Sequence, residues 1–369
     1  MGLDQADESH MRAALALARR GLGRVWPNPA VGCVLVQGGH VVGRGWTQAG
    51  GRPHAETEAT ARAGALARGA TVYVSLEPCA HWGGTPPCAE ALIGAGIARA
   101  VIAIEDPDPR VSGGGVAKLR AAGIPVALGA LAAEAEELNA GFLLRVRAGR
   151  PLVTLKLATS LDGRIAASGG DSRWVTGEAA RRRGHLLRAG HDAVLIGSGT
   201  ALADDPLLTC RLPGLTDRSP VRVVLDGRLR LPPAARLAAG ARELPTWVVT
   251  RADADPARRR ALTECGVEII EVAADPTGGL SLPAALQALG HRGLTRVLVE
   301  GGSRLTAALL QAGLVDRVAW FRAPSVLGGD ALPAAAALGV ARLAEAPSFR
   351  RTGVVAAGDD VLETYRRGP

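Results

Sequence analysis

Short apolar runs alternate with amphipathic segments along almost the whole of this 369-residue chain, and the alternation restricts the folds open to it. Residues 221–225 have the length and β-branched composition of a strand, whereas residues 178–189 have helical periodicity. Strands that alternate with helices form largely parallel sheets, which bind ligands at the carboxyl ends of their strands. The sequence therefore predicts an α/β protein.

The first half of the chain predicts an α/β/α domain. The end of this domain is marked by the turn residues Asn139-Ala140-Gly141, the basic stretch 145–150 and Pro151. We therefore expect one domain at residues 1–148 and a second at 149–369. Helices are predicted at residues 7–20, 54–68, 88–95 and 131–138, a hairpin at 30–36 and 40–43 around Gly38 and Gly39, and strands at 71–75 and 100–104.

The second half alternates again and predicts a mostly parallel sheet. Strands are predicted at 152–158, 193–197, 221–225, 246–250, 267–272, 297–300 and 318–321, with helices at 178–189, 282–289 and 303–311.

The charge of the chain favours small anions over nucleic acid as ligands. The formal net charge is +8, and the basic residues other than Lys118 and Lys156 are scattered arginines. Aromatic residues are only 3%, so stacking platforms for bases are scarce. We expect a protein that handles small phosphorylated molecules and binds no nucleic acid.

Composition also predicts a cytoplasmic protein without a membrane span. The longest apolar stretches, such as residues 334–340, are far shorter than a span, and the first ten residues carry Asp4, Asp7 and Glu8 instead of an export signal. Five cysteines, an odd number, argue against a disulfide framework and leave metal binding or burial as their uses.

One constellation carries strong chemical information. His54-Ala55-Glu56 is followed by Pro78-Cys79 and then by Cys88. One imidazole and two thiolates leave a tetrahedral zinc with an open position for water, and Glu56 beside His54 can shuttle protons. A His-x-Glu with a Pro-Cys pair is typical of zinc nucleobase deaminases.

Two other interpretations of these residues remain open. His54, Cys79 and Cys88 could be ordinary buried residues, or a closed structural zinc site with His81 as fourth ligand. Glu56 and Pro78 serve neither, which favours the catalytic interpretation. The remaining cysteines, Cys33, Cys210 and Cys265, have no partner spacing and are expected in the core or in loops.

Residues 77–88, EPCAHWGGTPPC, resemble the long inter-cysteine loop of the bifunctional riboflavin-biosynthesis deaminase/reductase family, with eight residues between the thiolates. Residues 27–32 (PNPAVG), 43–46 (GRGW) and 106–113 (DPDPRVSG) resemble the same family. The resemblance implies a cytidine-deaminase-like α/β/α domain in which Asn28 lines the pyrimidine pocket. The chain has Gly84, Thr47 and Asp108 where the family commonly has Arg, His and Asn.

The second half carries motifs that are weak singly. In residues 299–303, VEGGS, an apolar strand ends in a carboxylate, two glycines follow and a helix begins, which suits either an anion site or an ordinary tight turn. The other motifs are residues 151–158 (PLVTLKLA), 160–166 (SLDGRIA), 172–177 (SRWVTG), 197–200 (GSGT), 204–206 (DDP) and 208–211 (LTCR).

Together, in this order, the motifs resemble the reductase half of the same family, whose fold is similar to dihydrofolate reductase. The resemblance implies NADPH as hydride donor. The cofactor would be held by Ala158, Trp174, Thr200, Asp204, Gly302, Ser303, Arg304, Leu305, Thr306 and Ala307. The reductase substrate would be held by Lys156, Ser172, Arg188, Leu208, Arg211 and Glu300.

The shape and charge of some of these side chains indicate a role independently of the resemblance. Arg188 and Arg211 offer planar forks suited to a phosphate. Lys156 could place a compact ammonium near ribose hydroxyls, or it could be an ordinary strand lysine; both interpretations stay open. Asp162 and Asp205 could be turn caps. Four further arginines, Arg164, Arg181, Arg182 and Arg183, are expected to be solvated charges.

The resemblance implies a bifunctional enzyme with one Zn²⁺ per chain. It would deaminate 2,5-diamino-6-(5-phosphoribosylamino)pyrimidin-4-one by hydrolysis and then reduce the ribosyl side chain to ribityl with NADPH. A homo-oligomer is expected. The alternatives are a zinc nucleic-acid deaminase with a C-terminal RNA-binding domain, which the eight-residue gap and few aromatics disfavour, and an inactive zinc scaffold, which Glu56 disfavours.

Overall fold

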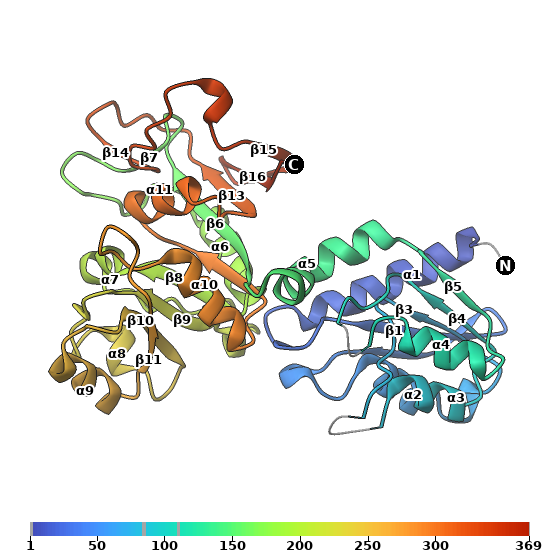
Figure 1. Cartoon of the computed structure of the whole chain (residues 1–369). Coiled ribbons are helices and arrows are strands. Elements are labelled where there is room, and N and C mark those ends of the chain that lie inside the picture. The colour runs from blue at the N-terminus through green and yellow to red at the C-terminus, as the bar shows by residue number, and fades with distance from the viewer. Residues whose placement is uncertain (1–2, 83–85, 109–110, 369) are drawn as a thin grey trace. The chain divides into compact units, whose positions relative to one another are not determined.

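The computed structural model describes residues 3–82, 86–108 and 111–368. The chain separates into two compact units, Met1–Gly149 and Arg150–Pro369, seen in Figure 1. The division falls one residue beyond the boundary expected from the sequence.

The first unit has three layers. Its five-stranded sheet has the order β2-β1-β3-β4-β5, in which β3, β4 and β5 are parallel and the other pairs antiparallel. Helices α1 and α5 cover one face and α2, α3 and α4 the other (Figure 1). The helices are α1 Gln5–Ala18, α2 Ala55–Ala63, α3 Cys88–Gly94, α4 Gly114–Ala121 and α5 Ala132–Ala148. The strands are β1 Gly32–Gln37, β2 His40–Trp46, β3 Thr71–Val74, β4 Arg99–Ile102 and β5 Val126–Leu128.

The hairpin and the α/β/α layering expected for this half are confirmed. Gly38 and Gly39 join β1 to β2 with φ of +56° and +79°, the left-handed conformation that a two-residue hairpin turn needs. Gly45 of β2 lets α2 approach the sheet, because an added Cβ would lie 2.1 Å from the Ala55 carbonyl oxygen. This close approach sets the position of the first turn of α2, which carries Glu56.

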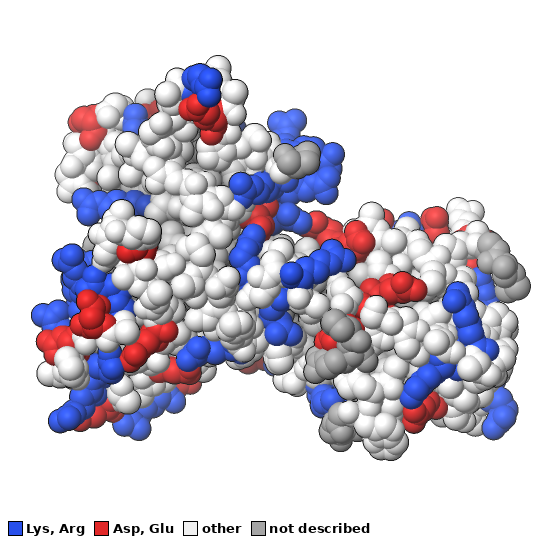
Figure 2. Space-filling model, viewed as in Figure 1, with Lys and Arg blue, Asp and Glu red and all other residues white. Residues whose placement is uncertain are grey.

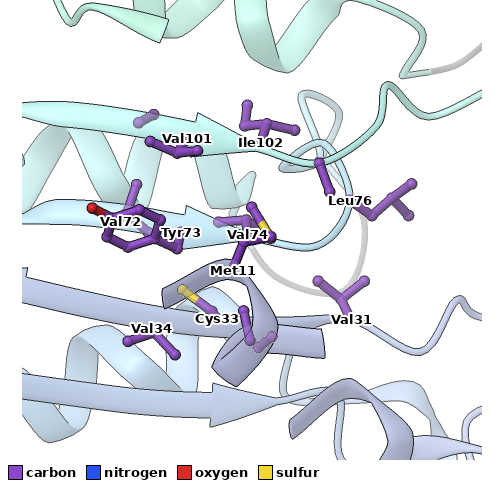
Figure 3. Packing of buried hydrophobic residues seen from close by; sticks show 14 of the residues in the cluster. Met11, Val31, Cys33, Val34, Val72, Tyr73, Val74, Leu76, Val101 and Ile102 are labelled. Carbon is purple, nitrogen blue, oxygen red and sulfur yellow. The ribbon is translucent and has the colours of Figure 1, made fainter. Parts of the chain in front are cut away.

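The core of the first unit lies between its helices and its sheet. Figure 3 shows Met11 of α1 packed with residues of β1, β3 and β4, among them Val34, Val74 and Ile102, none of which is exposed. Each such side chain contributes roughly 1.5–3 kcal/mol by leaving water. Since β3 and β4 are held firmly, the loops at their carboxyl ends start from fixed positions.

A buried ion pair joins α1 to the same sheet. Arg99 at the start of β4 donates to both carboxylate oxygens of Asp7, at 2.7 and 2.8 Å, and the Tyr73 hydroxyl donates to Asp7 Oδ1 at 3.0 Å. These hydrogen bonds, the Arg99 one first, hold the pKa of Asp7 below its usual value.

Three elements of this half differ from the expectation, and the first of them is β5, which was not predicted. The helix predicted to end at residue 138 continues as α5 to Ala148, because Asn139, Gly141 and Phe142 are buried along one side of it. Asn139 is no turn residue; its side chain accepts from Ala30 N at 3.0 Å and donates to Ala30 O at 3.1 Å. The Gly-rich helix α4 was not expected from the sequence.

The second unit is built on a nine-stranded sheet of order β11-β10-β9-β8-β12-β6-β13-β16-β15. Its neighbours from β11 to β13 are parallel, as expected, and the last two pairs are antiparallel. The strands are β6 Leu152–Thr159, β7 Arg164–Ala166, β8 Ala193–Gly197, β9 Val221–Leu225, β10 Thr246–Arg251, β11 Glu268–Val272, β12 Arg296–Val299, β13 Arg317–Arg322, β14 Leu332–Pro333, β15 Phe349–Ala357 and β16 Asp360–Arg367. The helices are α6 Glu178–Ala189, α7 Ser198–Asp204, α8 Arg236–Ala239, α9 Pro256–Glu264, α10 Leu282–His291 and α11 Ser303–Gln311.

All seven strands and three helices predicted for this half are present. The hairpin β15–β16 was not expected, although Gly358, with φ +70° at its turn, carried a signal for it. The small β7–β14 pair and the helices α7, α8 and α9 were also missed.

Two further features of the described residues are the distribution of charge on the surface and the hydropathy of the helices. Figure 2 shows basic groups interspersed with acidic ones on the face in view. Within residues 3–82, 86–108 and 111–368, no helix is long and apolar enough to cross a membrane.

Candidate active sites

Three elements of the first unit bring the predicted metal ligands together. His54 is the N-cap residue of α2, Cys79 follows β3, and Cys88 is the first residue of α3. Their donor atoms all lie within 4.8 Å of one another. His81, the alternative fourth ligand, is not part of this group in the described part of the chain.

The spacing of the donor atoms fits a tetrahedral zinc. His54 Nδ1 lies 3.3 Å from Cys88 Sγ and 3.7 Å from Cys79 Sγ. A zinc ion with Zn–S of about 2.3 Å and Zn–N of about 2.0 Å holds such a nitrogen and sulfur roughly 3.5 Å apart. The three ligands leave one position of a tetrahedron open, which is the arrangement of catalytic zinc sites.

The start of α3 supports one of the two thiols. The backbone amide of Cys88 donates to Cys79 Sγ at 3.3 Å. Hydrogen bonding from Cys88, foremost from its side chain, lowers the pKa of Cys79 to about 4. Cys79 is therefore prepared as a thiolate ligand.

Glu56 lies in the first turn of α2 and is 4% exposed. Burial raises its pKa to about 7, against the opposing effect of His54. A buried carboxyl beside the metal ligands, with a pKa near neutrality, suits a group that accepts and returns a proton.

A cavity of about 380 Å³ opens beside these groups. Asn28 lines it as expected, and Gly51 makes room for Asn28, because a Cβ there would lie 1.8 Å from Asn28 Nδ2. Arg52 and Arg145 also line the cavity, and the sequence singled out neither. Arg145 comes from the C-terminal turn of α5, so only the tertiary fold reveals its place.

The three departures from the family pattern fall in different places. Thr47 lines the cavity, but its hydroxyl accepts from Val31 N at 2.9 Å and donates to Pro29 O at 3.1 Å, so it secures the neighbouring backbone. Asp108 also lines the cavity, and its amide donates to Asp106 Oδ1 at 2.9 Å. Gly84 lies outside the described residues.

Glu77 fixes the loop that follows β4 and was not recognised as a separate site residue. Its buried carboxylate accepts from Asp106 N at 3.1 Å, Gly113 N at 3.0 Å and Val116 N at 3.0 Å. The loop that lines the cavity is thereby attached to the residue two positions before Cys79. The Glu-Pro-Cys string was the available signal for it.

In the second unit, Glu300 follows β12 directly and lies close to two cationic side chains. Arg188 of α6 donates through Nε to Oε1 at 2.6 Å and through Nη2 to Oε2 at 3.0 Å, and Lys156 Nζ of β6 lies 3.9 Å from Oε2. Burial alone would raise the pKa of Glu300, but Arg188 and Lys156 outweigh it and lower the pKa to about 2. Burial lowers the pKa of Lys156, because it disfavours the charged ammonium. The negative charge of Glu300 partly offsets this lowering.

Arg188 is oriented differently from the expectation. Its fork was expected to face a phosphate, but it faces Glu300, and Nη1 donates to Thr209 O at 2.9 Å. Arg211 is exposed. Burial, and after it the charges of Arg188 and Arg211, lower the pKa of His185. His185, one helical turn before Arg188, lies 3.1 Å from Thr209 O through Nδ1 and is an additional residue of this cluster.

Two of the residues expected to hold NADPH, Thr200 and Gly302, lie close together after the neighbouring strands β8 and β12. An added Cβ at Gly302, after β12, would lie 3.4 Å from Thr200 Oγ1, after β8. The Thr306 hydroxyl is buried and has no hydrogen-bond partner in the structure. Glycines directly before a helix allow a ligand to approach its N-terminal amides, so the start of α11 suits a dinucleotide's phosphates.

The remaining predicted residues of the reductase differ in their burial. Ala158 is half-buried in β6 opposite Phe321, Leu208 is buried, and Ser172 and Asp204 are exposed. Along α11, Ser303 and Ala307 are buried, Leu305 is half-buried and Arg304 is exposed.

Several arginines and aspartates were expected to be solvated charges or turn caps, and three of them make specific contacts. Arg181 is not merely solvated: its guanidinium lies 4.8 Å from the centre of the exposed Trp174 ring. Asp162 ties two loops together by accepting from Leu327 N at 3.1 Å and Gly328 N at 2.8 Å, and Asp205 accepts from Arg236 N at 2.8 Å.

Comparison with known proteins finds one family match in each unit. Residues 4–104 match the family model of the cytidine and deoxycytidylate deaminase zinc-binding region, and residues 151–362 match that of the RibD C-terminal domain. The riboflavin biosynthesis protein RibD of Escherichia coli is 43% identical over 96% of this chain and 98% of its own length. The chain belongs to the RibD family. RibD of Bacillus amyloliquefaciens is 42% identical over 97% of this chain and 95% of its own.

Solved RibD structures share the whole fold. Acinetobacter baumannii RibD superposes with a TM-score of 0.89 at 38% identity, covering 99% of both chains. A diaminohydroxyphosphoribosylaminopyrimidine deaminase/5-amino-6-(5-phosphoribosylamino)uracil reductase of Thermotoga maritima gives 0.86 at 37%, covering 98% of this chain and 99% of its own.

Membership of the RibD family confirms the bifunctional expectation. A cytidine-deaminase-like domain is followed by a dihydrofolate-reductase-like domain, and the enzyme is a deaminase and reductase of riboflavin biosynthesis. Its cofactors are Zn²⁺ and NADPH. Residues 151–362 match the RibD C-terminal domain, whereas the alternative required an RNA-binding domain in this half of the chain.

Proposed function

We propose that residues 1–148 form the deaminase and residues 149–369 the reductase, acting in that order on 2,5-diamino-6-(5-phosphoribosylamino)pyrimidin-4-one. The substrate assignment is supported by the name of the Thermotoga maritima relative. The observation that carries the proposal is the placement of His54, Cys79 and Cys88 beside the buried Glu56 at a cavity of about 380 Å³.

In the deaminase half, His54, Cys79 and Cys88 hold one zinc ion per chain. The ion, when bound, supplies Lewis-acid activation of water. Glu56 takes the proton released as water adds to the amine-bearing ring carbon and delivers it to the departing amine, so that a carbonyl and ammonia result. Asn28 lines the cavity as a partner for the pyrimidine ring.

In the reductase half, the cofactor-binding residues are Ala158, Trp174, Thr200, Asp204 and Gly302–Ala307. NADPH, when bound, supplies the hydride. Lys156, Ser172, Leu208, Arg211 and Glu300 bind the ribosyl substrate, and Arg188 orients Glu300 through the paired hydrogen bonds between them. The Lys156 ammonium, held near Glu300, orients sugar hydroxyls.

The proposal also covers the ligand class, the oligomeric state and the cellular location of the enzyme. The ligands are small phosphorylated pyrimidines, with no nucleic-acid or membrane partner, and the chain forms a homo-oligomer. A cytoplasmic location is supported by the free state of all five cysteines, which suits a reducing compartment. Light scattering of the purified chain measures the oligomeric state.

The decisive experiment mixes purified protein, the diamino substrate and NADPH, and follows the absorbance of NADPH. We expect the absorbance to fall, and removal of zinc with a chelator to prevent this with the diamino substrate. With the already deaminated substrate, NADPH oxidation should survive the chelator. Equal oxidation of NADPH from the diamino substrate with and without zinc would contradict the proposal.

A further inference from the structure

The segment of residues 208–211 in the reductase unit begins with an uncommon backbone conformation. Leu208 has a φ of +55°, in the left-handed region that residues other than glycine rarely adopt. Such a conformation persists only where the surrounding structure holds it in place. Arg211, which is proposed to bind the ribosyl substrate, ends this segment. The contacts that hold the segment therefore also decide where the side chain of Arg211 points.

Two side chains of α6 bind the backbone of this segment. Arg188 Nη1 donates to Thr209 O at 2.9 Å. His185, one helical turn earlier, accepts from Arg211 N through Nδ1 at 3.3 Å. The amide of Arg211 is therefore held by the imidazole of His185, and the carbonyl two residues before it by the guanidinium of Arg188.

The residue between these two contacts is packed against the same helix. Cys210 is buried, and its Sγ donates to the backbone carbonyl oxygen of His185 at 3.5 Å. The amide of Cys210 donates to Ser219 Oγ at 3.1 Å, so both its backbone and its side chain are held. Arg211 follows directly and is exposed. The hydrogen bond to His185 thus lies where the chain passes from the packed part of the unit to the exposed cation.

The imidazole can accept this hydrogen bond only when Nδ1 carries a lone pair. Burial, and after it the positive charges of Arg188 and Arg211, lower the pKa of His185. The ring is therefore neutral at neutral pH, and a neutral imidazole has one nitrogen that accepts. Thr209 O, 3.1 Å from Nδ1, already has a donor in Arg188 Nη1. The proton of the ring is not needed at that carbonyl, so it lies on Nε2 and Nδ1 is the accepting nitrogen.

We propose that His185 is a positioning residue of the reductase, which holds the amide of Arg211 and thereby directs the Arg211 guanidinium to the phosphate of the ribosyl substrate. This inference rests on the proposed role of Arg211 in binding that substrate. A fixed backbone reduces the conformational freedom that Arg211 loses when it binds a phosphate, and such pre-organisation strengthens the contact. Helix α6 then supplies two positioning side chains one turn apart, Arg188 for Glu300 and His185 for Arg211.

The test is steady-state kinetics of the full-length protein, with the already deaminated substrate and NADPH varied separately. His185→Ala removes the acceptor, so the KM for the phosphorylated substrate should rise about fivefold, the scale of one hydrogen bond. The kcat and the KM for NADPH should stay within about twofold, because the phosphate contact is made equally before and during the reaction. General damage to the fold would move all three constants together.

Two amide variants identify the atom of the imidazole that acts. The side-chain oxygen of Asn lies about as far from the backbone as Nδ1 does, whereas that of Gln lies about as far as Nε2. His185→Asn should therefore keep the KM for the phosphorylated substrate within about twofold of the wild type, and His185→Gln should resemble His185→Ala. If His185→Ala does not fold, this pair carries the test. An Asn variant no better than the Gln variant would overturn the assignment of Nδ1.

A double variant measures whether His185 acts through Arg211. Arg211→Ala removes the guanidinium that His185 is proposed to direct, so adding His185→Ala should change the KM of Arg211→Ala by less than about twofold. A further rise of about fivefold in the double variant would mean that His185 acts independently and would overturn the proposal. His291→Ala, which changes an exposed histidine in the last turn of α10, is the matched control and should behave as wild type.

The remaining outcomes separate this inference from the function beneath it. Wild-type constants in His185→Ala, or an equal rise in the KM for NADPH, overturn the positioning role and leave the reductase in place. An unchanged KM for the phosphorylated substrate in Arg211→Ala overturns the phosphate contact of Arg211 and this inference with it. A wild type that does not oxidise NADPH with the deaminated substrate overturns the reductase function itself.

Discussion

Glu300 and Arg188 show how a single residue's role depends on a partner far away in the sequence. Both were expected to touch the substrate, and the planar fork of Arg188 suggested a phosphate. In the fold the fork is bound to Glu300, at 2.6 and 3.0 Å, and to a backbone carbonyl. Arg211, exposed beside His185, is the cation of this cluster that faces solvent and can meet a phosphate.

Replacing Arg211 should therefore weaken the reductase in a selective way. A charge-assisted contact to phosphate is worth about 1.5–3 kcal/mol, so Arg211→Ala should raise the KM for the phosphorylated substrate by about tenfold or more. The KM for NADPH should barely move, and Arg182→Ala, an exposed arginine of α6, should behave as wild type. Steady-state kinetics with each substrate varied separately measures this; a defect confined to NADPH would reverse the assignment.

The zinc ligands give a second test at single residues. Cys88→Ser replaces a thiolate with a hydroxyl, a much poorer zinc ligand, so the protein should lose its zinc and its deaminase activity. Cys265→Ser changes a half-buried cysteine of the other unit and should keep one zinc per chain. Elemental analysis of both variants decides; full zinc content in Cys88→Ser would exclude Cys88 as a ligand.

Among the elements, the attachment of α1 to the sheet depends on a titrating pair. Arg99 and Asp7 are 15% and 2% exposed in their side chains, and the pKa of Asp7 is lowered by that contact. A carboxyl with a lowered pKa contributes stability above its unfolded pKa of about 3.9, and that stability is lost as the pH falls through the folded value.

Asp7→Asn should consequently speed hydrogen exchange of the α1 amides at pH 6 by about tenfold or more, since it removes a charged hydrogen bond worth roughly 1.5–3 kcal/mol. As the pH falls below about 3.9 and through the lowered folded pKa of Asp7, the ratio of variant to wild-type exchange should shrink, because the wild-type carboxyl becomes protonated over that range. Mass-spectrometric exchange at several pH values tests this. A ratio independent of pH would mean that the Arg99 contact stabilises nothing.

Local signals predicted most of the elements, and long-range packing decided the rest. The hairpin at Gly38 and Gly39 and the seven strands predicted for the second unit follow from short patterns. The continuation of α5 through Gly141 does not, because a helix keeps a glycine when its neighbours Asn139 and Phe142 find buried partners.

The same division holds within the sites. The zinc ligands and Glu56 could be identified because their spacing is itself a chemical signature. Arg52 and Arg145 line the same cavity without any local signature, and Arg145 reaches it only because α5 packs on that side of the unit. His185 likewise depends on its contact with the Thr209 carbonyl, 24 residues further along the chain.

For the whole molecule, each unit contains all the residues proposed for one of the two reactions. The proposed metal ligands and Glu56 lie within Met1–Gly149, and the residues proposed for NADPH and the ribosyl substrate lie within Arg150–Pro369. Loss of one reaction should therefore leave the other in place. This independence follows directly from two separate sites on one chain.

The most direct measurement of this claim is a pair of activities in Glu56→Gln. The variant keeps all three metal ligands, so its zinc content should equal that of the wild type. Deamination should fall by about a hundredfold or more, the scale of a positioned acid/base group. NADPH oxidation with the already deaminated substrate should continue at the wild-type rate. If both activities fell together, or if deamination survived, the assignment of two independent sites with Glu56 as the proton carrier would be contradicted.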